Sequence, residues 1–443
     1  NSAMGRNKRM GYFPAAGIAW NLQNESFMES LRDRWLDEAK IRVSVGQSGR
    51  APSGTSIYLG AYVKGDNYMN MSGTKPERMQ LDDLHWETST EYNYGADVML
   101  FGGRLKFTFD YYQKYIKDLL QKDYKLPSST GFGSMRYYNS GKMENKGWEF
   151  RADAIFWKNK DWQISGYVNL SRNENRITEL PGNMAQETYE ANNGKYAARV
   201  EVGQPVGAFY GYRYLGVYKD KDATYARDAS GNIMNDVHGK PIVMKNLTKA
   251  CQPGDAIYED INHDGVINQY DIVYLGNYNP VLTGGAGLTV KYKQVSLSAF
   301  FHGRFGQSIV NTARMNNESM YSDDNQSTAV LRRWRNEGDV TDIPRALYKE
   351  GYNYLGSDRF VEDASFIRLK TLTLNYLFPK KICNRLGINT LSCFVTGYNL
   401  FTWTNYTGQD PEVEIPTKPT DLAEDKATTP VSMRFAFGIN LNF

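Results

Sequence analysis

The last thirteen residues of the chain alternate strictly between apolar side chains and small or polar ones. A period of two residues predicts a β-strand with one apolar face and one small or polar face. A half-buried strand of a soluble β-sandwich gives the same pattern, so this segment alone leaves both a sandwich and a membrane barrel open. The apolar positions are Val431, Met433, Phe435, Phe437, Ile439, Leu441 and Phe443.

The same alternation recurs upstream, mostly in pairs of runs joined by tight turns. Residues 84–100 and 105–111 form one predicted hairpin, and two further hairpins follow the same plan. Together with single runs elsewhere, the pattern predicts eleven strands. They lie at residues 11–21, 39–47, 84–100, 105–111, 148–156, 162–170, 282–290, 295–301, 363–378, 390–402 and 431–443.

Long polar stretches separate the hairpins and alternate with the short turns. Loops of this length are unusual in a compact soluble domain, but short periplasmic turns and long extracellular loops are typical of an outer-membrane barrel. The polar stretches lie at residues 48–81, 121–144, 179–280, 306–362 and 403–430.

Parity constrains the path of the chain. If every short turn is periplasmic, the terminal strand descends, and counting backwards gives eleven crossings with the first residue outside. The strand-like run at residues 209–214 is then part of the excursion at residues 179–280, not a twelfth crossing. A complete single-chain bacterial barrel has an even number of strands with both ends periplasmic, so we expect further strands before residue 1.

Composition agrees with a barrel and excludes other classes. Aromatic residues make up 14% of the chain, and Tyr and Trp gather in girdles at the lipid–water interfaces of barrels. No window holds 18 consecutive apolar residues and the mean hydropathy is −0.58, which excludes a helical membrane protein. The 52 basic and 49 acidic residues form no long run of one sign, so nucleic acid is not an expected partner.

The sharpest short motif is the acidic loop at residues 260–271. Oxygen-bearing side chains stand at positions 1, 3, 5, 9 and 12, and Gly265 allows the sharp bend that a calcium loop needs. Position 12 is Asp rather than the usual Glu, which resembles dockerin-type loops, and no amphipathic helix flanks the motif. The alternative is a rigid turn that needs no metal. The predicted ligands of a stabilising Ca²⁺ are Asp260, Asn262, Asp264, the Val266 carbonyl, Asn268 and Asp271.

Catalytic patterns are absent from the sequence. The four histidines are widely separated, and neither a G-x-S-x-G nor a P-loop pattern occurs. The carboxylates Glu412 and Glu414 are interpreted as part of a solvated loop. We therefore predict no catalytic residues and no enzymatic activity.

Several phrases of the sequence are similar, in order, to the SusC/RagA-like family of TonB-dependent outer-membrane transporters. Each phrase is weak alone, but jointly they are specific and cover nearly the whole chain. They lie at residues 11–15, 40–49, 254–255, 260–271, 276–277, 366–374, 396–402, 410–413 and in the terminal strand, which resembles the signal that directs barrels into the outer membrane.

The resemblance implies an all-β fold. Residues 1–443 would be the C-terminal part, about eleven strands, of an antiparallel transmembrane barrel of about 22 strands with long extracellular loops. A plug domain and the N-terminal strands would precede residue 1. Polar side chains would face the lumen, among them Arg42, Arg368, Lys370 and Arg434.

The resemblance also implies a function, the active import of glycan or peptide fragments through the outer membrane. The expected partners are a SusD-like surface lipoprotein, the TonB complex acting through the plug region, an oligosaccharide or peptide substrate, and outer-membrane lipid. Two alternatives stay open. One is a non-transporting barrel that acts as an adhesin or passive pore, and the other is a secreted calcium-binding, polysaccharide-degrading protein.

Overall fold

The computed structural model describes residues 2–32, 34–69, 71–181, 194–197, 200–416 and 421–443. The chain divides into two compact units. The first comprises Asn1–Trp157, Ser165–Ala185 and Glu201–Pro205, and the second comprises Lys158–Ile164, Gln186–Val200 and Val206–Phe443. Over the described ranges, none of the helices has the length and apolarity required to cross a membrane.

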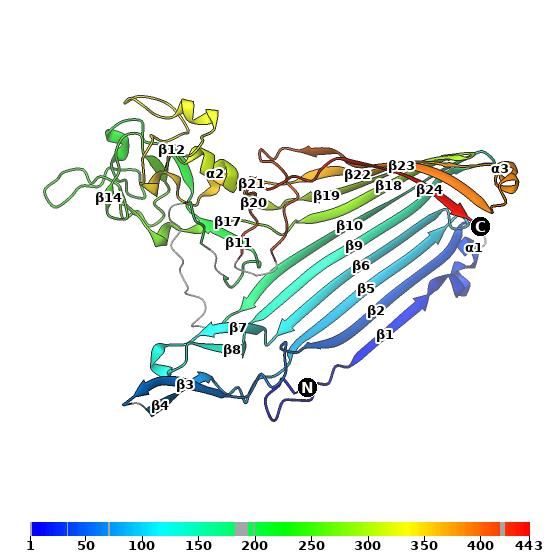
Figure 1. The fold of residues 1–443 in the computed structure, drawn as a ribbon, viewed down its shortest axis with the longest axis horizontal. Coiled ribbons are helices and arrows are strands. Elements are labelled where there is room, and N and C mark those ends of the chain that lie inside the picture. The colour runs from blue at the N-terminus through cyan, green and yellow to red at the C-terminus, as the bar shows by residue number, and fades with distance from the viewer. Residues whose placement is uncertain (1, 33, 70, 182–193, 198–199, 417–420) are drawn as a thin grey trace. The chain divides into compact units, whose positions relative to one another are not determined.

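Six long strands of the first unit lie side by side, as Figure 1 shows. Across the sheet, rows of polar or small residues alternate with rows of apolar and aromatic residues. Arg42 is opposite Gly95, which is opposite Asp110, whereas the neighbouring Val43 is opposite Tyr94. In sheet order the strands are β1 (Ala15–Asn21), β2 (Leu36–Arg50), β5 (Glu87–Leu100), β6 (Leu105–Lys117), β9 (Lys142–Lys158) and β10 (Trp162–Glu179).

The second unit contains five more long strands in the same antiparallel arrangement. Leu297, Leu374, Val395 and Phe437 are paired in one row across four of these strands, and all four side chains are exposed. In sheet order the strands are β18 (Leu282–Tyr292), β19 (Val295–Phe305), β22 (Phe366–Leu377), β23 (Thr390–Thr404) and β24 (Arg434–Asn442).

The apolar face of each unit is exposed rather than packed into a core. In the first unit Ile41, Val43 and Val45 are each more than a third exposed, and in β24 Phe437 is 76% exposed. A soluble protein does not leave rows of large apolar side chains in water, because each costs about 1.5–3 kcal/mol relative to burial. These faces therefore fit a lipid environment.

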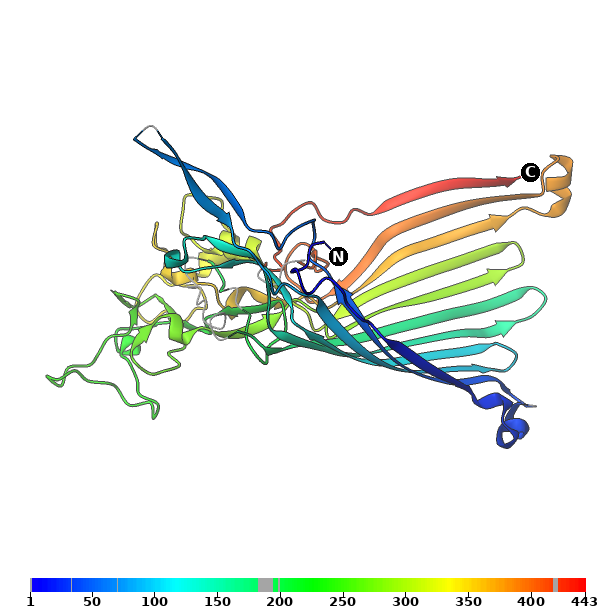
Figure 2. The same cartoon turned by 90° about the horizontal axis from the view of Figure 1, so that it is seen from below.

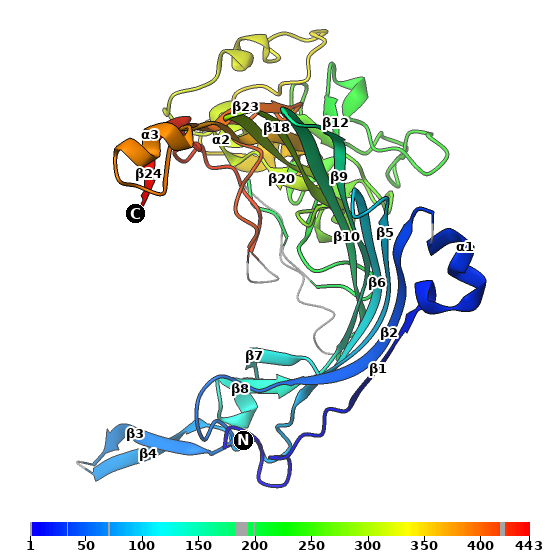
Figure 3. The same ribbon diagram turned by 90° about the vertical axis from the view of Figure 1, so that its right-hand side faces the viewer.

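Short turns and long loops lie at opposite ends of the strands. In the second unit, the β18–β19 turn and the helix between β22 and β23 are at the same end, as Figure 2 shows. In the first unit, two small hairpins occupy the long loops beyond the end of the strands that is opposite the β5–β6 turn (Figure 1), and Figure 3 shows each hairpin as a pair of adjacent short strands. They are β3 (Ala61–Tyr68) with β4 (Met71–Arg78), and β7 (Leu120–Lys125) with β8 (Ser134–Asn139).

The long loops of the second unit pack into cores of their own, rich in tyrosine. One core contains the fully buried Tyr210 together with Tyr212, Tyr218 and Tyr258. Their elements are β11 (Ala208–Gly211), β12 (Tyr214–Val217), β13 (Lys245–Asn246), β14 (Lys249–Ala250), β15 (Ala256–Tyr258), β16 (Val266–Ile267), β17 (Val273–Asn277), β20 (Ser308–Val310), α2 (Thr312–Glu318) and β21 (Val361–Asp363). The remaining helices are α1 (Glu29–Arg32) and α3 (Lys380–Arg385).

The predicted strands are confirmed: the described residues contain eleven long strands, one for each predicted run. The run at residues 209–214 belongs to the excursion, since β11 pairs with β17 and β12 pairs with β15. The strand ends differ from the prediction. β10 continues to Glu179, beyond the apolar alternation, because backbone hydrogen bonds extend a ladder whether or not its side chains are apolar.

The terminal strand begins later than predicted, at Arg434 rather than Val431. Arg434 pairs with Tyr398, and the next residue of β23, Asn399, has a φ of +53°. A residue in the left-handed region breaks the regular ladder, so pairing stops there.

Candidate functional site

Two basic side chains, Arg368 and Lys370, project from the long-loop half of β22. The register of β22 shifts between Leu369 and Thr371 against β23, and it also shifts against β19 at this point. Such a β-bulge re-aims the side chains beside it. Both cations consequently reach the same acidic segment of the chain.

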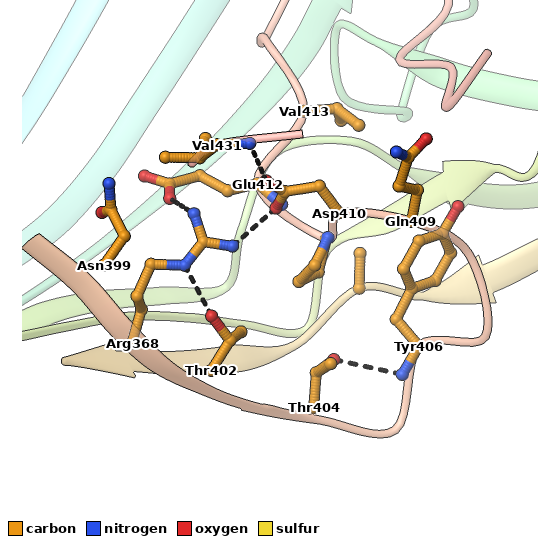
Figure 4. Close-up of polar contacts among 12 residues, drawn as sticks. Arg368, Asn399, Thr402, Thr404, Tyr406, Gln409, Asp410, Glu412, Val413 and Val431 are labelled. Atoms are coloured by element: carbon orange, nitrogen blue, oxygen red, sulfur yellow. Dashed lines mark hydrogen bonds and ion pairs between the residues drawn. The ribbon is translucent and has the colours of Figure 1, made fainter. Parts of the chain in front are cut away.

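That segment is residues 410–412 of the final loop, which we define as residues 405–433, between β23 and β24. The Arg368 guanidinium donates to Asp410 Oδ1 at 2.7 Å, to Glu412 Oε2 at 2.5 Å and to Thr402 Oγ1 at 2.8 Å (Figure 4). Lys370 Nζ donates to both oxygens of Glu412, at 2.7 and 2.6 Å. The Arg368 side chain is only 5% exposed, so its charge depends on these partners.

The final loop is also fixed at its beginning. Glu362 of β21 accepts hydrogen bonds from the backbone N–H and the hydroxyl of Thr407, and it pairs with Arg314 at 3.1 Å. Burial alone would raise the pKa of Glu362, but the hydrogen bonds from Thr407 and Arg314 outweigh it and lower that pKa. Tyr406 donates to Asp425 at 2.9 Å, and burial together with this carboxylate raises the pKa of its phenol.

The loop encloses an acidic cleft of about 800 Å³, with Tyr196 on its wall. Glu414 and Asp421 are exposed in it. The other carboxylates are engaged: Arg368 and Lys370 hold two of them, and Lys426 pairs with Glu424 at 2.6 Å. Ionised carboxylates only accept hydrogen bonds, so the cleft suits a ligand that presents ammonium, amide or hydroxyl groups. The lining carboxylates are Asp410, Glu412, Glu414, Asp421, Glu424 and Asp425.

In the first unit, a second charged cluster lies on the polar face of the strands. Arg42 Nε donates to Asp97 at 2.8 Å, and Arg42 Nη1 lies 3.1 Å from Asp110. The guanidinium fits because residue 95 is glycine: a Cβ there would lie 2.6 Å from the guanidinium carbon.

The last predicted lumen-facing cation, Arg434, belongs to the second unit. It stands on the polar face of β24 and lies over the Tyr398 ring at 5.7 Å. The four predicted lumen-facing cations thus all lie on polar faces, and three of them are ion-paired.

The predicted calcium ligands lie together in a tight loop that ends in the 3-10 turn Gln269–Asp271. Asp260 accepts from the backbone N–H of Gly265 at 2.8 Å, and Asp264 accepts from that of Val266 at 2.8 Å. Asp271 is fully buried and accepts from the N–H groups of Ile261 and Asn268. Burial is the main cause that raises the pKa of its carboxyl, with added repulsion from Asp260 and Asp264.

The other predicted ligands are also hydrogen-bonded within the loop. Asn262 Nδ2 donates to Asp264 at 2.9 Å, and Asn268 Nδ2 donates to the Val266 carbonyl at 3.1 Å. Across the described ranges, no group of three or more His, Cys, Asp or Glu side chains is arranged to hold a metal ion. The predicted set also relies on two Asn side chains and a carbonyl, so calcium stays a prediction.

Sequence reasoning missed the role of Glu412, which it interpreted as part of a solvated loop. Its side chain is 16% exposed and bound to two cations. It also missed the ion pair between Arg345 and the buried Asp255, at 2.6 Å, which ties the excursion to the loop at residues 306–362. The phrases that carried the resemblance include both Arg368 and Glu412, which was the one available signal, but nothing in them shows that the two segments meet.

Comparison with known proteins gives one family and consistent relatives. The family model described as "TonB dependent receptor-like, beta-barrel" matches residues 2–238. TonB-dependent receptor P3 of Formosa agariphila is 30% identical over 461 residues, and the match covers all of this chain and 43% of that protein. TonB-dependent receptor SusC of Bacteroides thetaiotaomicron is 28% identical over 468 residues, covering all of this chain and 41% of that protein.

Among solved structures, the RagAB peptide transporter matches the whole chain with a TM-score of 0.77 at 24% identity, covering 44% of the matched chain. The RagAB peptide importer in its "closed-closed" state matches with a TM-score of 0.76. At this identity the likeness concerns the fold. The chain spans about two fifths of the length of these relatives.

Proposed function

Because the chain belongs to the TonB-dependent receptor-like family of outer-membrane β-barrels, we propose that it forms part of the wall of an active importer of glycan or peptide fragments. Membership in this family assigns the chain to receptor barrels of the outer membrane rather than to enzymes. It also removes the alternative of a secreted polysaccharide-degrading protein, which the exposed apolar strand faces contradict independently.

One observation carries the import proposal beyond the family. At the long-loop end, an acidic cleft large enough for a small ligand is built on a loop that Arg368 and Lys370 tie to the barrel strands. The long-loop end of a barrel is extracellular. A cleft at that position would receive solutes from outside, and its carboxylates would favour fragments rich in amino groups, such as basic peptides.

We further propose two partners, a SusD-like surface lipoprotein on the extracellular loops and the TonB complex on the periplasmic side. The lipoprotein proposal is supported by the similarity to a protein named SusC and to the fold of the RagAB transporter. The TonB proposal is supported by the family name. Both partners would act on a whole transporter. The matched relatives are longer than this chain, which spans about two fifths of their length.

The proposal is tested by uptake of fluorescent peptides and oligosaccharides into cells that express the protein, with and without TonB. Active import predicts uptake that requires TonB. Uptake that continues without TonB would support a passive pore, and no uptake of any probe together with surface binding would support an adhesin.

The cleft is tested by the double variant Glu414→Gln with Asp421→Asn, because both side chains are exposed and make no ion pair within the described ranges. Binding of a lysine-rich peptide should weaken about tenfold, and binding of a neutral oligosaccharide should not change. The matched control is Asp222→Asn with Asp323→Asn, two exposed acids outside the cleft. Equal effects of the two double variants would assign the cleft no role in recognition.

A further inference from the structure

The short-turn end of the second unit is strongly basic. Three connections meet there: the β9–β10 turn at residues 158–161, the β18–β19 turn at residues 291–294, and the segment at residues 378–389 that contains α3. They carry seven basic residues and one acidic residue, Asp161. The basic residues, all exposed, are Lys158, Lys160, Lys291, Lys293, Lys380, Lys381 and Arg385.

The three connections are neighbours in space. The backbone N–H of Lys293 donates to the Asp161 carbonyl at 2.7 Å, and the rings of Trp162 and Tyr292 lie 4.4 Å apart. The N–H of Leu377, at the start of the third connection, donates to the Gln294 carbonyl at 2.8 Å. The seven cations thus lie on three adjacent connections at one end of the unit, which we call the basic surface.

The helix α3 has an apolar pair that no protein segment covers in the described part of the chain. Cys383 and Ile388 point inward and are buried. Ile382 and Leu386, four residues apart and therefore on one helix face, are 40% and 61% exposed. The exposed apolar row of β22 continues towards this helix, because Leu374 and Tyr376 lie on one face of the strand and are both exposed.

The charges of α3 are equally unpartnered. Lys380, Lys381 and Arg385 are exposed, and none of them belongs to an ion pair within the described ranges. No Asp or Glu occurs in residues 378–389. An exposed apolar pair flanked by three free cations is the pattern of a helix that lies at a membrane surface with anionic headgroups.

We propose that this surface binds anionic phospholipid in the periplasmic leaflet of the outer membrane, with α3 as its centre. Short turns of outer-membrane barrels are periplasmic, which puts α3 at the level of the headgroups. Ile382 and Leu386 enter the edge of the hydrocarbon region next to the lipid-facing strands. Lys380, Lys381 and Arg385 bind headgroup phosphates, and the aromatic side chains Trp162 and Tyr292 occupy the interface. The proposal does not depend on what the barrel transports.

The test measures which lipids the protein retains. The protein, purified from outer membranes in mild detergent, is equilibrated with equal amounts of dioleoylphosphatidylglycerol and dioleoylphosphatidylcholine, and bound lipids are counted by native mass spectrometry. The wild type should retain the anionic lipid at least fivefold in excess. The triple variant Lys380→Gln, Lys381→Gln, Arg385→Gln should bring the ratio of the two lipids to about one, since each cation near an anionic surface contributes about fivefold to binding and all three are removed.

Two matched variants control for net charge and for local structure. Lys221→Gln, Lys240→Gln, Lys245→Gln removes three exposed cations from the long loops and should leave the preference unchanged. Lys380→Arg, Lys381→Arg, Arg385→Lys keeps the charges and should retain it. If the triple glutamine variant does not fold, Lys381→Gln alone should reduce the preference about fivefold.

Three results would overturn the proposal. One is a wild-type protein without preference for the anionic lipid. Another is an equal loss in the long-loop control. The third is an unchanged lipid ratio in the triple glutamine variant, even if an acidic periplasmic protein no longer co-purifies with it.

Discussion

Replacing Arg368 by Met should loosen the final loop without unfolding the barrel. The change removes three hydrogen bonds, to Thr402, Asp410 and Glu412, and leaves two carboxylates without their shared cation. Breaking a buried ion pair by removing one partner costs about 3–5 kcal/mol. The Asp410 and Glu412 side chains are 17% and 16% exposed, so some hydration remains and we expect the lower end, about 3 kcal/mol.

A cost of about 3 kcal/mol makes opening of the final loop about a hundredfold more frequent. Hydrogen exchange followed by mass spectrometry measures this directly, on peptides from residues 405–416 and 421–433 of the protein in detergent micelles. The strands β22 and β23 should keep wild-type protection, because their ladder of backbone hydrogen bonds is not changed.

Lys370→Met is the matched comparison, since Lys370 shares Glu412 but is 24% exposed. A more exposed pair contributes about 1 kcal/mol, so exchange should rise only about fivefold. The double variant Arg368→Met, Asp410→Asn should recover much of the loss, because Asp410 then carries no charge and Lys370 still neutralises Glu412. Wild-type exchange in Arg368→Met, or an equal effect of Lys370→Met, would contradict the role of Arg368 as the main anchor of the final loop.

Three further predictions concern the loops. If Ca²⁺ fills the acidic loop, free calcium at a hundred times its Kd adds about 2.7 kcal/mol to the stability of the protein. EGTA should then lower Tm by several degrees in the wild type and have no effect in Asp260→Asn. A wild-type Tm that does not respond to EGTA would exclude the metal. The folded-state pKa of Glu362 lies below its ordinary value of 4.5, so the stability that Glu362 contributes is present above pH 4.5 and is lost as the pH falls through the folded-state pKa. Glu362→Gln should therefore flatten the loss of hydrogen-exchange protection of the final loop at acidic pH. An unchanged pH profile of that protection would contradict this. Gly254 has a φ of +89°, and an added Cβ would lie 2.4 Å from the Trp334 ring. Gly254→Ala should therefore destabilise the excursion by about 2 kcal/mol, measured by its rate of proteolysis. Gly231→Ala should destabilise it less, because the space around a Cβ at that position is open.

The long strands were predictable because their signal is local. Alternation with a period of two and a tight turn between two runs are written in adjacent residues, and the sequence places all eleven strands. Their ends were less predictable. Residues 171–179 extend β10 although they are mostly polar, because a backbone ladder continues as long as a neighbour is present.

The site was not predictable from patterns, because it is made of contacts between distant segments. Arg368 and Glu412 are separated by 44 positions, and nothing local distinguishes Glu412 from a solvated acid. The bulge that aims Arg368 and Lys370 depends on both neighbours of β22. Conversely, the acidic loop at residues 260–271 was visible in the sequence, but the same oxygens also satisfy its own backbone N–H groups.

A wall in the outer membrane requires that the apolar rows of these strands face lipid and the polar rows face the lumen. Site-directed spin labelling of β24 tests it, in the membrane-reconstituted protein with Cys251, Cys383 and Cys393 replaced by Ala and single nitroxides placed along the strand. A membrane-spanning wall requires a period of two. Oxygen accessibility should be highest at positions 435, 437, 439 and 441, and accessibility to a water-soluble nickel chelate should be highest at positions 434, 436, 438 and 440. Apolar positions that are shielded from both reagents would instead indicate a protein core, and apolar positions open to the nickel chelate would indicate water; either result contradicts a membrane-spanning wall.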